Sequence, residues 1–209
     1  MCPEPASSVP DLAPFVPPPL NALGSFQVTF QNRCVVTVWP AWGTSSGLDN
    51  TVVDTQIWFP MLPGTDRTVT VYGGLRDIGL WGRTACSFDQ EGLGACQTGD
   101  CGGFKCPTRV GSFPASATVF DLMLGFFGGY NVGLQVDGMA CGRHECVADL
   151  GTCGGASAVV DSCGGTVACR DACSEAAPEC CRDARSACSE EQTDHDTEGT
   201  DDLVVTFCP

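Results

Sequence analysis

Cysteine is the residue type with the most evident chemistry in this sequence, which contains 16 cysteines among 209 residues. Thiols at such density serve either as disulfides or as metal ligands. Structural zinc sites rely on C-x2-C pairs and on well-placed histidines. No C-x2-C occurs here, and the histidines are His144 and His195. We therefore expect disulfides, no bound metal and an oxidising, extracellular compartment.

Carboxylates are the second chemical group, with 25 acids against 10 bases and a net charge of −15. This charge repels phosphate backbones and anionic lipid heads, so we expect no nucleic-acid partner. Residues 190–202 concentrate acids around His195 but lack the D-x-D-x-D-G order of a calcium loop. We expect a solvated loop there and no cofactor. His144 follows Arg143 in a cysteine-rich stretch, and we expect it to be an exposed loop residue.

The elements that position these groups are predicted to be strands. Residues 26–31 alternate apolar and polar side chains, which is the pattern of a half-buried strand. Asn32 and Arg33 can turn the chain into a second strand at 35–39, which Pro40 ends. Further strands are expected at 56–59, 68–72, 80–83, 118–124, 131–136 and 203–207. The sequence thus predicts an all-β fold, an antiparallel β-sandwich with a small disulfide-rich loop region.

Composition divides the chain into an arm and a domain. Residues 1–25 are rich in proline and are expected to form a linker or arm. The domain covers 26–209, with the sandwich core in 26–140 and 203–209 and a reduced cysteine-rich region in 141–202. No apolar run is long enough to span a membrane. No signal peptide is visible, although the cysteines predict an extracellular protein. We expect a monomer.

Three blocks of the sequence resemble the thaumatin-like family, the sweet-protein and pathogenesis-related group. The first is FQVTFQNRC at 26–34, followed by TVWPA at 37–41. The second is LWGRTACSFDQEGLGACQTGDCGGFKC at 80–106, and the third is VVTFCP at 204–209. The resemblance covers residues 26–209 and implies the thaumatin-like sandwich and a secreted, defence-related protein.

The resemblance also implies a disulfide framework. It pairs Cys34–Cys208, Cys86–Cys96, Cys101–Cys106, Cys153–Cys169, Cys173–Cys180 and Cys181–Cys188. A segment that follows Cys188 in the family is missing here, together with two cysteines. Cys2, Cys141, Cys146 and Cys163 are left over, and their three possible pairings stay open.

Many family members have an acidic cleft, formed by an arginine, a glutamate and three aspartates, that is tied to β-1,3-glucan binding. Alignment places Gly79 at the arginine, Asp121 at the first aspartate and Gly128 at the second. The glutamate has no counterpart, and the third aspartate belongs to the missing segment. We expect Asp121 and Tyr130 to contact a ligand, the latter by stacking on a sugar ring. Nearby aromatic side chains could also stack or belong to the core; they are Phe120, Phe126 and Phe127.

Two functions from different classes remain open. Because one of five cleft residues survives, we favour a non-catalytic protein that binds a polysaccharide or an extracellular protein, and we assign no catalytic residue. Reduced family members include inhibitors of glycosidases, which act without hydrolysis. The alternative is a weak endo-β-1,3-glucanase using Asp121 and a second carboxylate. Asp89, Glu91 and Asp137 are the candidates for that second group.

Overall fold

The computed structural model describes residues 25–44, 52–53, 58–72, 78–106, 113–121, 125–138, 142–170 and 202–209. The strands are β1 Ser25–Asn32, β2 Val38–Thr44, β3 Val52–Val53, β4 Asp66–Tyr72, β5 Ile78–Phe88, β6 Gly94–Thr98, β7 Thr118–Asp121, β8 Gly125–Gly128, β9 Leu134–Gly138, β10 Gly142–Cys146, β11 Ala158–Val160, β12 Thr166–Cys169 and β13 Leu203–Phe207. Two 3-10 turns, η2 Leu150–Thr152 and η3 Gly155–Ser157, are the helical elements of the described part. The prediction of an all-β fold is confirmed, and no described helix is long and apolar enough to cross a membrane.

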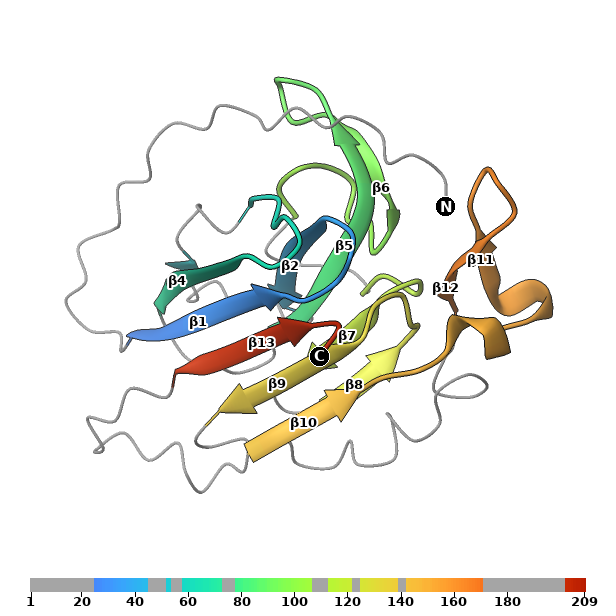
Figure 1. Cartoon of the computed structure of the whole chain (residues 1–209). Coiled ribbons are helices and arrows are strands. Elements are labelled where there is room, and N and C mark those ends of the chain that lie inside the picture. The colour runs from blue at the N-terminus through green and yellow to red at the C-terminus, as the bar shows by residue number, and fades with distance from the viewer. Residues whose placement is uncertain are drawn as a thin grey trace.

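The strands form two large sheets packed face to face and a small third sheet (Figure 1). One large sheet has the order β10-β9-β13-β1-β4-β3, and the other has the order β2-β5-β7-β8 with β6 also paired to β5. The third sheet consists of β11 and β12. The sandwich is as predicted, except that β1 and β13 pair in parallel. Because these strands come from opposite ends of the chain, no hairpin turn imposes an antiparallel direction on them.

The second strand differs from its prediction. Pro40 does not end it but lies inside β2, opposite Gly82 of β5. Proline is tolerated there because β2 is an edge strand of its sheet. Residues 33–37 instead carry the chain from one sheet to the other, and Val35 is 81% exposed on this crossing. The strand expected at 56–59 is partly outside the described residues, and Trp58 and Phe59 are not in a strand.

The sandwich extends beyond residue 140, where the cysteine-rich region was expected to begin. β10 is the edge strand of the six-stranded sheet and pairs with β9. The expectation that His144 is an exposed loop residue is wrong, because His144 lies on β10 and is half-buried. Its ring centroid is 5.6 Å from that of Phe120 on the facing sheet.

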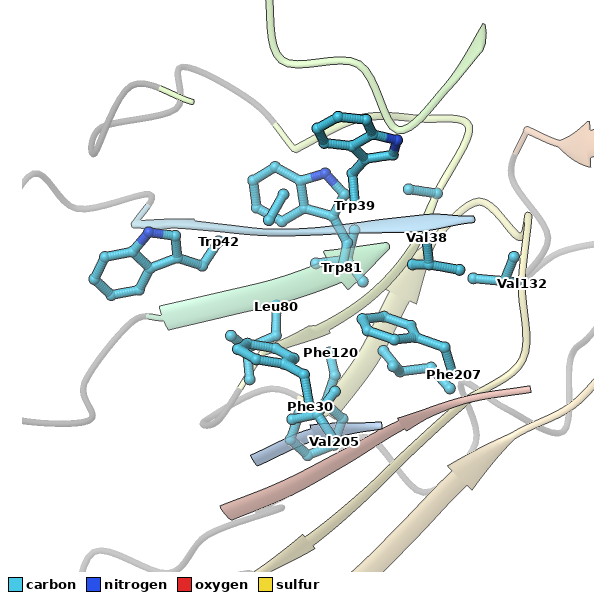
Figure 2. Close-up of a cluster of buried hydrophobic side chains, with 14 of the residues drawn as sticks. Phe30, Val38, Trp39, Trp42, Leu80, Trp81, Phe120, Val132, Val205 and Phe207 are labelled. Carbon is cyan, nitrogen blue, oxygen red and sulfur yellow. The ribbon is translucent and has the colours of Figure 1, made fainter. Parts of the chain in front are cut away.

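The core lies between the two large sheets (Figure 2). Phe30 and Phe207 stack there with ring centroids 6.2 Å apart, and Leu80 and Phe120 reach them from the other sheet. A Cβ atom on Gly82 would lie 2.9 Å from the Phe207 ring, so the sheets approach closely at this glycine. Burial of each large apolar side chain contributes about 1.5–3 kcal/mol.

A second apolar layer covers the opposite face of the five-stranded sheet. Trp39 projects from the side of β2 opposite Val38, as Figure 2 shows, and packs on Phe88 and Phe104 with centroids 5.4 and 5.8 Å away. Trp81, on β5, belongs to the same layer and donates from Nε1 to the carbonyl of Gly99 at 2.9 Å. Both faces of β5 are therefore buried from Ile78 to Arg83.

Disulfides fasten the sandwich at the pairs that the family resemblance implies. Bridges join Cys34–Cys208, Cys86–Cys96, Cys101–Cys106 and Cys153–Cys169. Cys146 and Cys163 are also disulfide-bonded, so each cysteine of the described part is oxidised. The expected bridges Cys173–Cys180 and Cys181–Cys188, and the positions of Cys2 and Cys141, lie outside the described residues.

Candidate ligand-binding site

Asp121, the carboxylate expected to contact a ligand, ends β7 at the centre of the five-stranded sheet. It lies opposite Gly79 of β5 and Gly125 of β8. Strand alternation places it on the outer face of that sheet, beside Val119 and away from the inward-facing Phe120. Its side chain is only 2% exposed and already has an interaction partner. In this structure Asp121 is therefore a buried acid.

An aromatic ring fills the space beside Asp121. A Cβ atom at Gly79 would lie 2.6 Å from Cζ of Phe113. The Phe113 ring is held edge-to-face against Trp81 and Phe127, with centroids 5.8 and 5.2 Å away. Gly79 is the position at which the resemblance implies an arginine, and an arginine side chain does not fit unless Phe113 moves. Sequence reasoning did not find Phe113, because a loop residue before a strand carries no periodic signal.

Tyr130, the expected sugar-stacking residue, is 5% exposed and joins two parts of the fold. Its backbone exchanges hydrogen bonds with Cys169, at 2.8 and 2.6 Å, and so connects the small sheet to the sandwich. Burial raises the pKa of the Tyr130 phenol, and the nearby Asp149 raises it further, while a hydrogen bond with the Ala148 backbone lowers it. The ring has no open face on which a sugar could stack.

The other aromatic candidates are also packed. Phe120 and Phe126 are buried against each other with centroids 4.9 Å apart, and the half-buried Phe127 contacts Phe113. For Phe120 this is the core position that strand alternation favours. These rings stabilise the fold rather than present a stacking platform.

Three further carboxylates were candidates for a hydrolytic partner of Asp121. Asp89 and Glu91 lie at the tip of the β5–β6 hairpin, where Asp89 accepts hydrogen bonds from the backbone amides of Glu91 and Leu93. Asp121 is paired near the opposite end of β5, so the separation along the strand is on the order of 30 Å. Glycosidase carboxylates lie roughly 5–10 Å apart. Neither hairpin acid is within hydrolytic reach of Asp121.

Asp137 is separated from Asp121 by the whole sandwich. On β9 the inward-facing residues are Leu134 and Val136, so Asp137 points outward from the six-stranded sheet, where it accepts from the amide of Gln135. Asp121 points outward from the other sheet. Two β-layers about 10 Å apart lie between the two carboxylates. The described residues thus bring no named carboxylate into a hydrolytic pair with Asp121.

A buried cation not anticipated from the sequence lies beneath the signature block. Arg83 of β5 is 0% exposed, and burial lowers its pKa to about 10, although the charge of Asp100 raises it. Its Nη1 and Nη2 donate to the carbonyls of Gly103 and Phe104 at 2.9 and 3.1 Å. Asp100 accepts from the amide of Cys96 at 2.9 Å, which is the capping role that its place among the glycines favours. This arginine fixes the Cys101–Cys106 loop and is closed to ligands.

Comparison with known proteins identifies the family. The Thaumatin family model matches residues 32–209. The chain belongs to the thaumatin family. A pathogenesis-related thaumatin-like protein 3.5 from Cryptomeria japonica is 32% identical over 223 residues, covering 89% of this chain and 91% of the relative. Pathogenesis-related protein 5 of Arabidopsis thaliana is 34% identical over 172 residues, covering 75% of this chain and 69% of the relative.

Among solved structures, this thaumatin-family chain is similar to a thaumatin-like xylanase inhibitor, with a TM-score of 0.45 and 25% identity over 87% of this chain and 99% of the other. Among the described residues, no group of three histidine, cysteine or acidic side chains is arranged to hold a metal ion.

Proposed function

We propose that this thaumatin-family protein is secreted and non-catalytic, and that it acts in defence or cell-surface recognition by binding a glycan of the β-glucan type or an extracellular protein. The names of its relatives support the defence role, since they are pathogenesis-related proteins. The disulfides of the described part support an extracellular location.

The observation that carries the non-catalytic part of this proposal is the packing around Asp121. Hydrolysis of a glycosidic bond needs one carboxyl group as acid and a second as base or nucleophile. Asp121 is buried beside Phe113, and the three other candidate acids are at the far end of β5 or on the opposite face of the sandwich. Burial of Asp121 and the distance of these three described acids support a structural role rather than turnover.

The test combines binding and turnover on the same sample. The protein is sedimented with insoluble β-1,3-glucan, and reducing ends are measured in the supernatant. We expect retention on the glucan without release of reducing ends, and we expect Asp121→Asn to bind as the wild type does. Release that Asp121→Asn abolishes would instead support a weak glucanase. If the protein does not sediment with the glucan, the glycan-binding part of the proposal is wrong and a protein partner is favoured.

A further inference from the structure

The Cys101–Cys106 disulfide, in the loop that follows β6, lies against a buried cation. Nη1 of Arg83 is 3.5 Å from Sγ of Cys101, in addition to its hydrogen bond with the carbonyl of Gly103. A positively charged neighbour is one of the environments that stabilise a cysteine thiolate. The bridge therefore has a charged partner in place for the anion that its reduction produces.

The charge of Arg83 is incompletely compensated while the bridge is oxidised. The guanidinium carbon lies 5.7 Å from the ring centroid of Trp58 and 5.6 Å from that of Phe88. The buried Nε has no hydrogen-bond partner among the described residues. Burial lowers the pKa of Arg83 to about 10, so the side chain is still protonated at neutral pH. Between apolar walls, an anion beside this cation is stabilised more strongly than it would be in water.

Asp100 is the acid whose charge acts on Arg83, and its oxygens already serve the backbone. Its charge opposes the effect of burial on the pKa of Arg83. Oδ1 accepts from the amide of Cys96 at 2.9 Å, and Oδ2 accepts from the amide of Gly102 at 3.2 Å. The carboxylate thus compensates the arginine without a direct hydrogen bond within the described part of the chain. A thiolate at Cys101 would be in direct contact with the guanidinium.

The bridge is also open to a reductant on one side. Cys101 is half-buried, and its neighbour Gly102 is exposed, with no atom within 4 Å of the place where a Cβ would lie. Access to sulfur is one of the factors that set the rate of thiol–disulfide exchange. Two other bridges have both of their cysteines buried, namely Cys86–Cys96 and Cys153–Cys169. Sγ of Cys169 lies 3.6 Å from the carbonyl oxygen of Arg170, whose partial negative charge disfavours a thiolate.

We propose that Cys101–Cys106 is a thiol–disulfide exchange site that a dithiol reduces in the folded protein, with Arg83 as the positioning residue that stabilises the Cys101 thiolate. This site does not depend on the proposed binding function. The bridge joins residues 5 positions apart, whereas Cys34–Cys208, which joins residues 174 apart, continues to close the sandwich. Reduction therefore opens one loop and leaves the two sheets tied together.

The exchange consists of two displacements at sulfur. A thiolate of the dithiol attacks Sγ of Cys101 and forms a mixed disulfide, while the bond to Cys106 breaks and Cys106 takes up a proton. The second thiolate of the reductant then attacks the reductant's own sulfur in the mixed disulfide and releases Cys101 as a thiolate beside Arg83. The dithiol loses two electrons and becomes a disulfide, and the two cysteines gain these electrons. One of its two protons is bound by Cys106, and the other goes to solvent.

The first test is the order in which the bridges are reduced. The native protein is incubated with dithiothreitol at neutral pH, free thiols are blocked with iodoacetamide at intervals, and mass spectrometry of peptides quantifies each cysteine. We expect Cys101 and Cys106 to be released about tenfold faster than the cysteines of the comparison bridges, at an unchanged circular-dichroism spectrum. The comparison bridges are Cys34–Cys208, Cys86–Cys96 and Cys153–Cys169. If Cys101 and Cys106 are released no faster than these, the bridge is not an exchange site.

The second test is the pH dependence of Cys101 alkylation in the partly reduced protein, measured in the native state and in urea. An ordinary cysteine thiol has a pKa of about 8.5, and burial alone would raise the midpoint of the alkylation curve. We expect the native midpoint to lie about one pH unit below the midpoint in urea, which is a tenfold gain in thiolate at low pH. A native midpoint equal to or above the midpoint in urea would overturn the proposal.

Variants then separate Arg83 from other charges. Arg83→Met should abolish the downward shift of the Cys101 midpoint, and Arg83→Lys, which keeps the charge, should retain part of it. The matched control is Arg143→Met, which removes the same charge from an exposed position on β10 and should leave the midpoint as in the wild type. If Arg83→Met folds and keeps the full shift, the guanidinium does not stabilise the thiolate and the proposal is wrong. If Arg83→Met does not fold, the comparison of native and urea-unfolded wild type decides.

Discussion

Gly79 lies on the strand next to that of Asp121, and Phe113 lies over it. Gly79 pairs with Asp121 across β5 and β7, and the Phe113 ring packs over Gly79. The ring belongs to an aromatic cluster that includes Trp81 and Phe127. The family resemblance implies an arginine, a bidentate donor, at the Gly79 position, where this chain has room only for the Phe113 ring.

This packing predicts the effect of a single methyl group. Gly79→Ala should lower the free energy of unfolding by about 1–3 kcal/mol, because the new Cβ overlaps the Phe113 ring. Phe113→Ala added to Gly79→Ala should remove the overlap and make the two changes non-additive. Urea unfolding of the two single variants and the double variant measures the coupling. Strict additivity would show that Phe113 does not fill this space.

The burial of Tyr130 predicts that the free energy of unfolding depends on pH. Burial raises its pKa above the ordinary value of 10.0, so the folded state favours the protonated phenol. The stability that this contributes is present below about pH 10 and is lost as the pH rises through the raised pKa. The free energy of unfolding should thus fall more steeply above pH 10 in the wild type than in Tyr130→Phe. Parallel curves would show that Tyr130 does not cause this pH dependence. The second tyrosine, Tyr72, is present in both proteins, so its titration cancels in the comparison.

At the scale of elements, β5 and the loop that follows β6 form one unit. Arg83 projects from β5 into the loop closed by Cys101–Cys106, and its guanidinium binds two loop carbonyls. The charge is desolvated, and no carboxylate hydrogen-bonds to it within the described residues. Displacement of this loop would expose both Arg83 and the apolar layer around Trp39 to solvent, so the packing holds the loop in place.

Arg83→Ala should therefore destabilise the protein by about 3–5 kcal/mol, since it leaves a void and two carbonyls without donors. Arg83→Lys, which keeps the charge but lacks the planar fork, should be intermediate. Melting temperatures of the two variants test this order. A melting temperature of Arg83→Ala equal to that of the wild type would show that the loop does not depend on the guanidinium.

Strands with clear alternation were predictable, and strands defined by their neighbours were not. Residues 26–31 lie in β1, because their apolar and polar residues alternate as a half-buried strand requires. β10 was missed, since GRHEC is polar and becomes a strand only by pairing with β9. The parallel direction of β13 also depends on tertiary contacts. At the candidate site, Asp121 was found through a resemblance of sequence, whereas the packing of Phe113 over Gly79 joins residues distant in sequence and carries no local pattern.

At the scale of the molecule, one bridge closes the chain. Cys34–Cys208 joins residues 174 positions apart, whereas Cys153–Cys169 joins residues 16 apart. In the chain-entropy account, loss of the long loop costs about 5 kcal/mol and loss of the short one about 3 kcal/mol. The bridge thereby offsets part of the self-repulsion expected of a chain with a net charge of −15.

We expect the double change of Cys34 and Cys208 to serine to lower the melting temperature more than the same change at Cys153 and Cys169. Both pairs are replaced together so that no free thiol is created. Thermal unfolding under non-reducing conditions compares the two variants. The reverse order would show that the cysteine-rich region, rather than the closure of the sandwich, limits stability.

The central claim, that this thaumatin-family protein binds without hydrolysing, is tested most directly by a long time course with laminarin. Reducing ends are measured over days for the wild type, Asp121→Asn and a heat-inactivated sample. Because Asp121 is buried and Asp89, Glu91 and Asp137 lie outside hydrolytic reach of it, we predict three indistinguishable, flat traces. A wild-type trace that rises while the Asp121→Asn trace stays flat would contradict the claim and identify Asp121 as a catalytic carboxylate.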